Sequence, residues 1–211
     1  MGAAPLRRGF TPAPSPKPVG YSSIKHKPGC QIVSHYEFRL ATKLSEIEAY
    51  FDLRRAIFAQ EQQLFSNNDD WDEIDRTAYP IVAIAIDTQK VVGVVRIYQP
   101  EPGLWYGGRL GTHPEYRKGW EIGKGLIYKA VTTANAWGCD RFLATVQLQN
   151  VRFFQRLHWQ SLEEVTICDR LHHLMEADLS YYPPDPSYLS ITSPQEAINA
   201  SIPRRSTATV A

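Results

Sequence analysis

The sequence lacks the features that would place the chain in a membrane or on nucleic acid. No apolar run approaches the roughly 20 residues that a membrane-spanning helix needs. The 23 Lys and Arg are balanced by 22 Asp and Glu, whereas a general nucleic-acid-binding protein usually has a basic excess. Prolines follow Arg7 and Arg8, where a signal peptide would have its apolar core. We therefore expect a cytoplasmic protein with neither a nucleic-acid nor a membrane partner.

Cysteine is also scarce. Cys30, Cys139 and Cys168 are too few and too scattered for a disulfide framework, and no pair has zinc-ligand spacing. We expect a reduced chain without a metal. The proportions of apolar residues, 43%, and charged residues, 21%, are those of ordinary globular proteins. A chain of 211 residues can bury one core and hardly two.

Both ends are rich in proline. Residues 1–29 contain six prolines, five Lys or Arg and no acid, which predicts a disordered basic arm with little to bury. Residues 181–211 predict a second extended tail rich in Pro and Ser, with a short helix near 195–200. One domain is therefore expected over residues 30–180.

Within this domain, strand and helix patterns alternate. Ser45 and Glu48 predict a capping box at the start of the first helix, and the β-branched runs on either side of residues 87–90 predict a hairpin. The order implies an α/β fold with a mixed sheet and helices on both faces. The expected strands are 31–39, 81–86, 91–98, 104–112, 141–147, 161–167 and 171–179, and the expected helices begin at 45 and span 122–137 and 150–157.

The most informative stretch is residues 109–127, which predict a strand, a turn rich in glycine and cations, and a helix start. A helix N-terminus offers unpaired N–H groups, and Arg117, Lys118 and Lys124 add positive charge, which suits a phosphate or pyrophosphate. The alternative is a glycine-containing loop with exposed cations and no ligand. Spacing alone does not separate these two interpretations.

This stretch resembles the acetyl-CoA segment of the GCN5-related N-acetyltransferases. That segment is a strand ending in His-Pro, here His113-Pro114, then a basic residue, a short glycine loop and a helix. Lys118 or Arg117 matches the basic position and Gly123 the closing glycine, whereas Glu121 stands where the first loop glycine usually is. The resemblance implies a mostly antiparallel, twisted sheet and acetyl-CoA as co-substrate.

Residues 150–159 are similar to a later segment of the same family, in which an Asn contacts the pantetheine arm and a Tyr often protonates the departing thiolate. Phe154 occupies that Tyr position and cannot be an acid. For Phe153 and Phe154, core packing is the alternative to ligand contact. The co-substrate-binding residues that the resemblance implies are Leu110, Gly111, Thr112, Arg117, Lys118, Gly119, Trp120, Ile122, Gly123, Lys124, Gly125, Asn150, Phe153 and Phe154.

An acidic segment follows the first helix: residues 61–75 hold six Asp or Glu and no Lys or Arg. A helical Arg before an acid-rich loop resembles a bacterial subgroup of these acetyltransferases, the nitrogen-starvation N-acetyltransferases, and more distantly the acyl-homoserine lactone synthases. Without that resemblance, the segment is a solvated turn. With it, the clustered carboxylates predict a cationic, polyamine-like acceptor.

The function implied is N-acetyl transfer from acetyl-CoA to a primary amine by direct attack. The acceptor is a small molecule or a peptide amine, and a homodimer is left open. A backbone N–H at 110–112 would bind the thioester oxygen, and water or Tyr98 would protonate the thiolate. The candidate bases for the amine are Glu61, Asp72, Glu73, Asp75 and His113.

Two alternatives remain at this stage. One is an acyltransferase like the acyl-homoserine lactone synthases, which would use a longer acyl donor and S-adenosylmethionine. The other is a non-catalytic acyl-CoA-binding regulatory module, which Glu121 and Phe154 make plausible.

Overall fold

A computed structural model of the chain describes residues 35–65, 69–167 and 170–188, all of which belong to one compact unit, Ser34–Ala211. The predicted arm at 1–29, the start of the predicted strand at 31–39 and the predicted helix at 195–200 lie outside the described residues. Within the described part, no helix is both long and apolar enough to cross a membrane.

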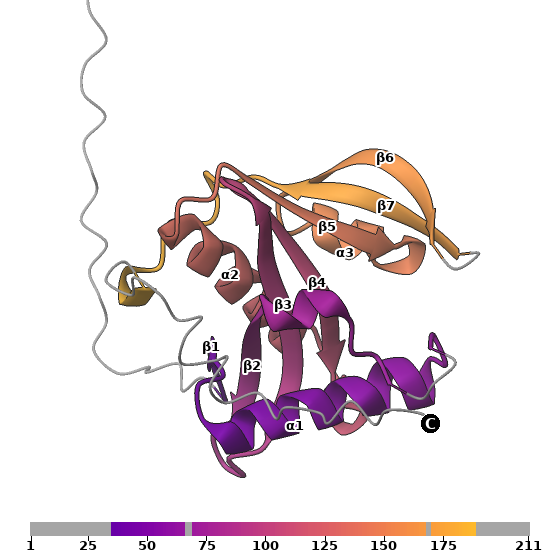
Figure 1. The fold of residues 1–211 in the computed structure, drawn as a ribbon, viewed down its shortest axis with the longest axis vertical. Coiled ribbons are helices and arrows are strands. Elements are labelled where there is room, and N and C mark those ends of the chain that lie inside the picture. Colours follow the sequence, from indigo (N-terminus) through magenta and orange to yellow (C-terminus); the bar gives the residue numbers. More distant parts are fainter. Residues whose placement is uncertain (1–34, 66–68, 168–169, 189–211) are drawn as a thin grey trace, which may run out of the picture. The chain divides into compact units, whose positions relative to one another are not determined.

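The fold is built on a seven-stranded sheet of order β1-β2-β3-β4-β5-β7-β6 (Figure 1). All neighbouring strands pair antiparallel except β4 and β5, which are parallel and are connected by α2. The predicted mixed, mostly antiparallel sheet is confirmed. The strands are β1 Tyr36–Leu40, β2 Tyr79–Ala85, β3 Val91–Glu101, β4 Leu104–Thr112, β5 Arg141–Gln147, β6 Trp159–Ile167 and β7 Arg170–Ala177.

Helices pack on both faces because the strand residues alternate in direction. On β2, Val82 and Ile84 pack with α1 (Leu44–Arg54), whereas Ile81 and Ala83 share a second core with α2 (Glu121–Ala136). The short α3 (Val151–Gln155) lies on the α2 side, since Val151 and Phe154 belong to the second core. Both faces of the inner strands are thus buried.

The parallel pairing of β4 with β5 is short. Leu104–Gly107 pair with Arg141–Ala144, and the strands diverge beyond that point (Figure 1). We call this opening the β4–β5 gap. Because β4 continues to pair with β3 up to Thr112, one edge of its backbone faces the gap.

The start of α1 differs from the expectation. Lys43 is the N-cap and makes no side-chain cap bond, so the predicted capping box at Ser45 and Glu48 is wrong; Ser45 lies inside the first turn. A capping box does occur in the acidic segment. There the Asp72 carboxylate accepts from the Ile74 N–H, and the Asp75 carboxylate accepts from the Asp72 N–H.

The domain also extends past the predicted boundary at residue 180. Tyr182 is 1% exposed, and its backbone oxygen accepts from Nδ2 of Asn135 on α2 at 2.6 Å. Its hydroxyl donates to the Leu157 carbonyl. Three residues on, Asp185 accepts from Nζ of Lys129 at 2.6 Å. The chain just after residue 180 is therefore packed against α2 rather than part of an extended tail.

The Asp185–Lys129 pair makes a pH-dependent contribution to stability. Burial alone would raise the pKa of Asp185, but its bonds to Lys129 and to Ser187 hold that pKa below its usual value. A lowered folded-state pKa contributes stability above the unfolded value of about 3.9, and that stability is lost as the pH falls through the folded pKa. We expect Asp185→Asn to lower the free energy of unfolding at pH 7 by about 1 kcal/mol.

Urea unfolding at several pH values tests this. The difference between Asp185→Asn and the parent chain should shrink as the pH falls below the unfolded value and toward zero below the folded-state pKa, where the carboxyl is protonated in both states. The exposed Asp52, which pairs with Arg55 at 3.3 Å, supplies the control Asp52→Asn, expected to change stability by less than about 0.5 kcal/mol. An equal loss at pH 7 and pH 2.5 would contradict the ion-pair account.

Candidate active site

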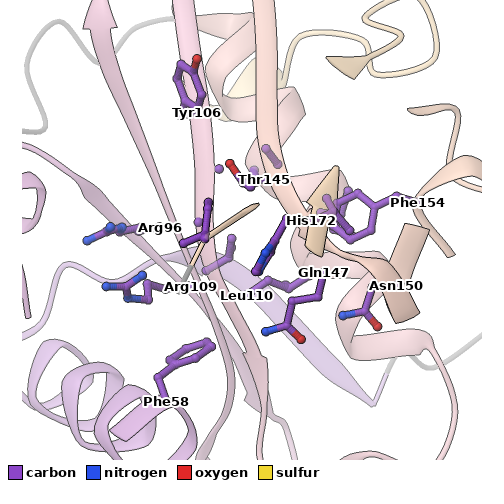
Figure 2. A pocket seen from close by; sticks show the side chains of 18 of the residues that line it. Phe58, Arg96, Tyr106, Arg109, Leu110, Thr145, Gln147, Asn150, Phe154 and His172 are labelled. Atoms are coloured by element: carbon purple, nitrogen blue, oxygen red, sulfur yellow. The ribbon is translucent and has the colours of Figure 1, made fainter. Parts of the chain in front are cut away.

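A cavity of about 390 Å³ passes through the β4–β5 gap, and we call it the central cavity (Figure 2). On the α1 side its wall includes Phe58, Phe65, Arg96 and Arg109. The opposite side is mostly apolar and is formed by α2, α3 and β5 through β7; this wall contains Ile127, Ala130, Val131, Phe142, Ala144, Phe154 and Trp159. The cavity therefore has one polar and one apolar end.

Behind the polar end lies a buried group of charges, the arginine–aspartate cluster, formed by Arg54, Asp70, Asp72, Asp75, Arg96 and Arg109. At its centre, the side chain of Arg54 on α1 is fully buried. Its Nε donates to Asp70 at 2.7 Å, and its Nη1 and Nη2 donate to Asp75 at 2.5 and 2.9 Å. Buried charges are tolerated when they are paired and hydrogen-bonded in this way.

Arg96 and Arg109 complete the cluster from β3 and β4. Arg96 donates through both Nη atoms to Asp72 at 2.7 Å. Arg109 donates to Asp70 and Asp72 at 3.2 Å. Three arginines thus neutralise three carboxylates of the acidic segment, and the concentration of negative charge that we predicted there is not formed.

Arg109 has an unusual backbone for a strand residue, with φ 54°. It follows Gly107 and Gly108 at a shift in the register with β3. Its guanidinium lies 4.7 Å from the ring centroid of Phe65. Burial, together with the charges of Arg96 and Arg54, lowers the pKa of Arg109, which is ordinarily so high that the group stays cationic. A strained backbone of this kind persists where surrounding contacts hold it, and it is common at functional sites.

None of the five candidate bases lines the central cavity. Asp72 and Asp75 are held in the cluster; burial would raise the pKa of Asp75, but bonds to Arg54 keep it below its usual value. Glu61 accepts both Nη atoms of Arg117 at 2.6 and 2.7 Å, which lowers its pKa. Glu73 pairs at the surface with Arg76, at 2.9 Å. His113 lines a second cavity of about 420 Å³ near the start of α1.

The predicted anion site at the start of α2 has the expected backbone. The N-cap is Trp120, which makes no side-chain cap bond, so the first N–H groups of this helix have no intrahelical partner. A Cβ built on Gly123 would meet only the Phe153 ring, at 3.6 Å, so the fold leaves space above this residue. Glu121, Lys118 and Lys124 are exposed. The guanidinium of Arg117 is instead held by Glu61 and the carbonyl of Thr112.

Other predicted co-substrate residues divide between the cavity and the core. Leu110, Asn150 and Phe154 line the central cavity. Gly111 and Gly125 serve packing, because a Cβ on them would lie 2.8 Å from Ile57 and 2.2 Å from Phe38. Gly119 precedes α2 with φ 95°, and Ile122, in the first turn of α2, is buried in the core. Phe153 packs edge-on against Trp120.

Several cavity residues were not anticipated. Arg96 interrupts the β-branched run 91–98, and Arg109 stands in a predicted strand. A single charge within a buried strand needs a partner, and that signal could have identified both. Nothing local distinguishes the other unanticipated polar wall residues, which are Gln62, Tyr106, Thr145, Gln147, Arg170 and His172.

Several solved acyltransferase structures have a similar fold. An acyl-CoA N-acyltransferase from Pseudomonas aeruginosa is 19% identical, with a TM-score of 0.57 over 67% of this chain and 97% of that chain. Escherichia coli ElaA is 22% identical, with a TM-score of 0.59 over 68% and 99%. A CoA-dependent acyl-homoserine lactone synthase, BjaI, is 15% identical, with a TM-score of 0.55 over 69% and 79%. These likenesses concern the fold.

A comparison with curated proteins finds no significant match. The sequence model of the acetyltransferase (GNAT) family matches residues 45–159, which include α1, the acidic segment, the start of α2 and all residues that line the β4–β5 gap from β4 and β5. Because this match spans more than half of the chain, the protein belongs to the GNAT acetyltransferase family.

Proposed function

We propose that the protein transfers an acyl group, with acetyl-CoA as the expected donor, directly to the nitrogen of a small primary amine. The observation that carries the proposal is the central cavity, which runs through the β4–β5 gap. The unpaired edge of β4 offers backbone N–H groups to a thioester oxygen there, where negative charge develops during attack. The bare N-terminus of α2 suits the pyrophosphate of the same donor.

The amine must lose a proton before it attacks, because an alkylamine with a pKa near about 10.4 is mostly protonated at neutral pH. His172 lies in the cavity wall, with Nδ1 at 2.9 Å from the Arg170 carbonyl oxygen. Since a carbonyl only accepts, this contact favours the tautomer of the neutral ring in which Nδ1 carries the proton and Nε2 has the lone pair. We add His172 Nε2 to the candidate bases. The alternative is that one of the five earlier candidates accepts the proton through a chain of water molecules.

Tyr98 is the candidate proton donor for the departing thiolate. Its side chain lines the central cavity and stacks on Tyr106 with ring centroids 5.6 Å apart. Burial raises the pKa of Tyr98, so the phenol keeps its proton at neutral pH. Because a thiolate leaves readily, we expect Tyr98→Phe to lower kcat by only about tenfold, at unchanged affinity for CoA. Tyr106→Phe is the matched control; equal losses in both would point to altered packing rather than proton transfer.

The direct test uses the full chain, purified and supplied with acetyl-CoA and a panel of primary amines, while release of free CoA is followed with a thiol reagent. Acylation of at least one amine, confirmed by mass, supports the proposal. Tight binding of CoA in calorimetry without any acylation would instead favour the regulatory acyl-CoA-binding module.

A second candidate is transfer of a longer acyl chain. It is favoured by the apolar end of the cavity, where Ala130, Val131 and Phe142 leave space beyond the gap. The structure of BjaI is described with isopentyl-CoA and SAM, and a similar donor would suit this wall. A series of acetyl-, isovaleryl- and octanoyl-CoA distinguishes the two candidates: kcat/KM highest for acetyl-CoA supports the first, and a rise with chain length supports the second.

The nitrogen-starvation N-acetyltransferase subgroup, a cytoplasmic location and a homodimer belong to the same proposal. A cytoplasmic location is consistent with the proposed donor, because acyl-CoA is an intracellular metabolite. The mass in solution tests the homodimer.

A further inference from the structure

The charge on the wall of the central cavity is opposite to the charge of the acidic segment. Arg96 and Arg109 lie together on the α1 side of the cavity (Figure 2). Arg170 belongs to its wall as well. Among the described residues, none of those that line the cavity is Asp or Glu. Arg96 and Arg109 line the cavity, whereas Asp70, Asp72 and Asp75, which pair with them, do not.

Arg109 has hydrogen-bonding capacity to spare. Its Nε and Nη2 are bonded to Asp70 and Asp72, and in the described part of the chain Nη1 has no partner. One-fifth of its side-chain surface is accessible, and the residue lines the cavity. The ion pairs and the Phe65 ring fix the guanidinium plane, so that this free edge is held in place.

Arg96 provides an independent sign of an unmet partner. Its side chain is 5% exposed, and its buried Nε has no hydrogen-bond partner within the described residues. Buried donors in native proteins are normally satisfied, so an unsatisfied one in the wall of a cavity indicates a missing acceptor. The same atom lies beside Gly108, since a Cβ there would be 3.5 Å from it.

We propose that the acceptor amine also carries a carboxylate, as an amino acid does, and that this carboxylate binds Nη1 of Arg109. The inference rests on the proposed function and names its substrate class. A fixed guanidinium edge matches a carboxylate in shape and charge. Arginines beside the amine also favour its neutral form, because like charges oppose protonation, and the neutral form is the one that attacks. The cationic, polyamine-like acceptor expected from the sequence is replaced by a zwitterionic one.

The experiment compares matched acceptors: L-methionine, L-phenylalanine and L-glutamine, each against its carboxamide and its decarboxylated amine, with acetyl- and isovaleryl-CoA as donors. We expect kcat/KM for the best acid to exceed that for its carboxamide by about tenfold to a hundredfold, the effect of one charge-assisted hydrogen bond. Arg109→Gln should bring this ratio close to one, and Arg109→Lys should retain part of it. Arg55→Gln is the control, because Arg55 directly follows Arg54 in the chain, pairs with Asp52 and does not line the cavity.

The outcomes distinguish failure of the carboxylate site from failure of the proposed acyl transfer. If carboxamides or simple amines are acylated as well as the acids, or if O-phosphoethanolamine is preferred, acyl transfer stands and the carboxylate site is overturned. If CoA binds and no acceptor of any class reacts, the proposed function fails and the inference fails with it. Should Arg109→Gln not fold, the acid-to-carboxamide ratio of the parent chain decides by itself.

Discussion

Replacing Arg54 with methionine is expected to lower the free energy of unfolding by about 3–5 kcal/mol, because it leaves Asp70 and Asp75 buried without their main partner. Methionine keeps much of the side-chain volume, so the loss reports charge pairing more than a cavity. For a domain of this size the melting temperature should fall by roughly 6–20 °C. Thermal and urea unfolding, followed by circular dichroism, measure the change.

The neighbouring residue supplies a matched control. Arg55 pairs with Asp52 at the surface, at 3.3 Å, and Arg55→Met should change stability by less than about 0.5 kcal/mol. Equal effects of the two substitutions would show that the cluster contributes nothing beyond a surface pair. The remaining ion pairs of Arg96 with Asp75 and of Arg109 with Asp70 set a limit on the loss.

Gly123→Asp is expected to weaken CoA binding on the order of a hundredfold, through repulsion between its carboxylate and the pyrophosphate. The folded chain should tolerate the change well. The Cβ would meet only Phe153 at ordinary contact distance, and an acid in the first turn interacts favourably with the helix dipole. Affinity and stability should therefore move in opposite directions, which a merely structural defect would not produce.

Isothermal calorimetry with CoA and thermal unfolding of the same samples test this. Gly123→Asn has nearly the same size without the charge, so the difference between the two variants isolates the electrostatic part. If the Asp variant binds CoA as tightly as the parent, the pyrophosphate does not lie at the start of α2. The central cavity would then have to bind the donor in another orientation.

The strands were the most predictable part of the molecule. The predicted bounds 104–112 and 141–147 are those of β4 and β5, because β-branched and aromatic residues there are flanked by Gly103, Gly138 and the His113-Pro114 pair. The helix from 122 is within one residue of α2 for the same reason, since Gly138, with φ 81°, ends the helical pattern. Such residues mark the ends of strands and helices from within a few positions, so the sequence alone reveals them.

The site was less predictable because its partners are distant in sequence. Arg109 binds Asp70 and Asp72 across 39 and 37 residues, and no local pattern reports such a pairing. The charges within residues 61–75 alone predicted negative charge near the acceptor, whereas the cavity wall contains arginines and, among the described residues, no Asp or Glu. The π-helical continuation of α1 over Arg55–Glu61 was also missed, because sequence periodicity does not distinguish one extra residue per turn from an ordinary helix end.

The short pairing of β4 with β5 has a consequence for how the domain opens. Backbone pairing between β1–β4 and β5–β7 is limited to four residue pairs, while the second core packs residues of both groups of strands around α2. We therefore expect the β4–β5 pairing to open at a lower free energy than global unfolding. A thioester lying in the gap would contact both groups and resist that opening. Binding of CoA should therefore slow amide hydrogen exchange on both sides of the gap, at residues 104–112 and 141–147, more than in the β1–β2 pair.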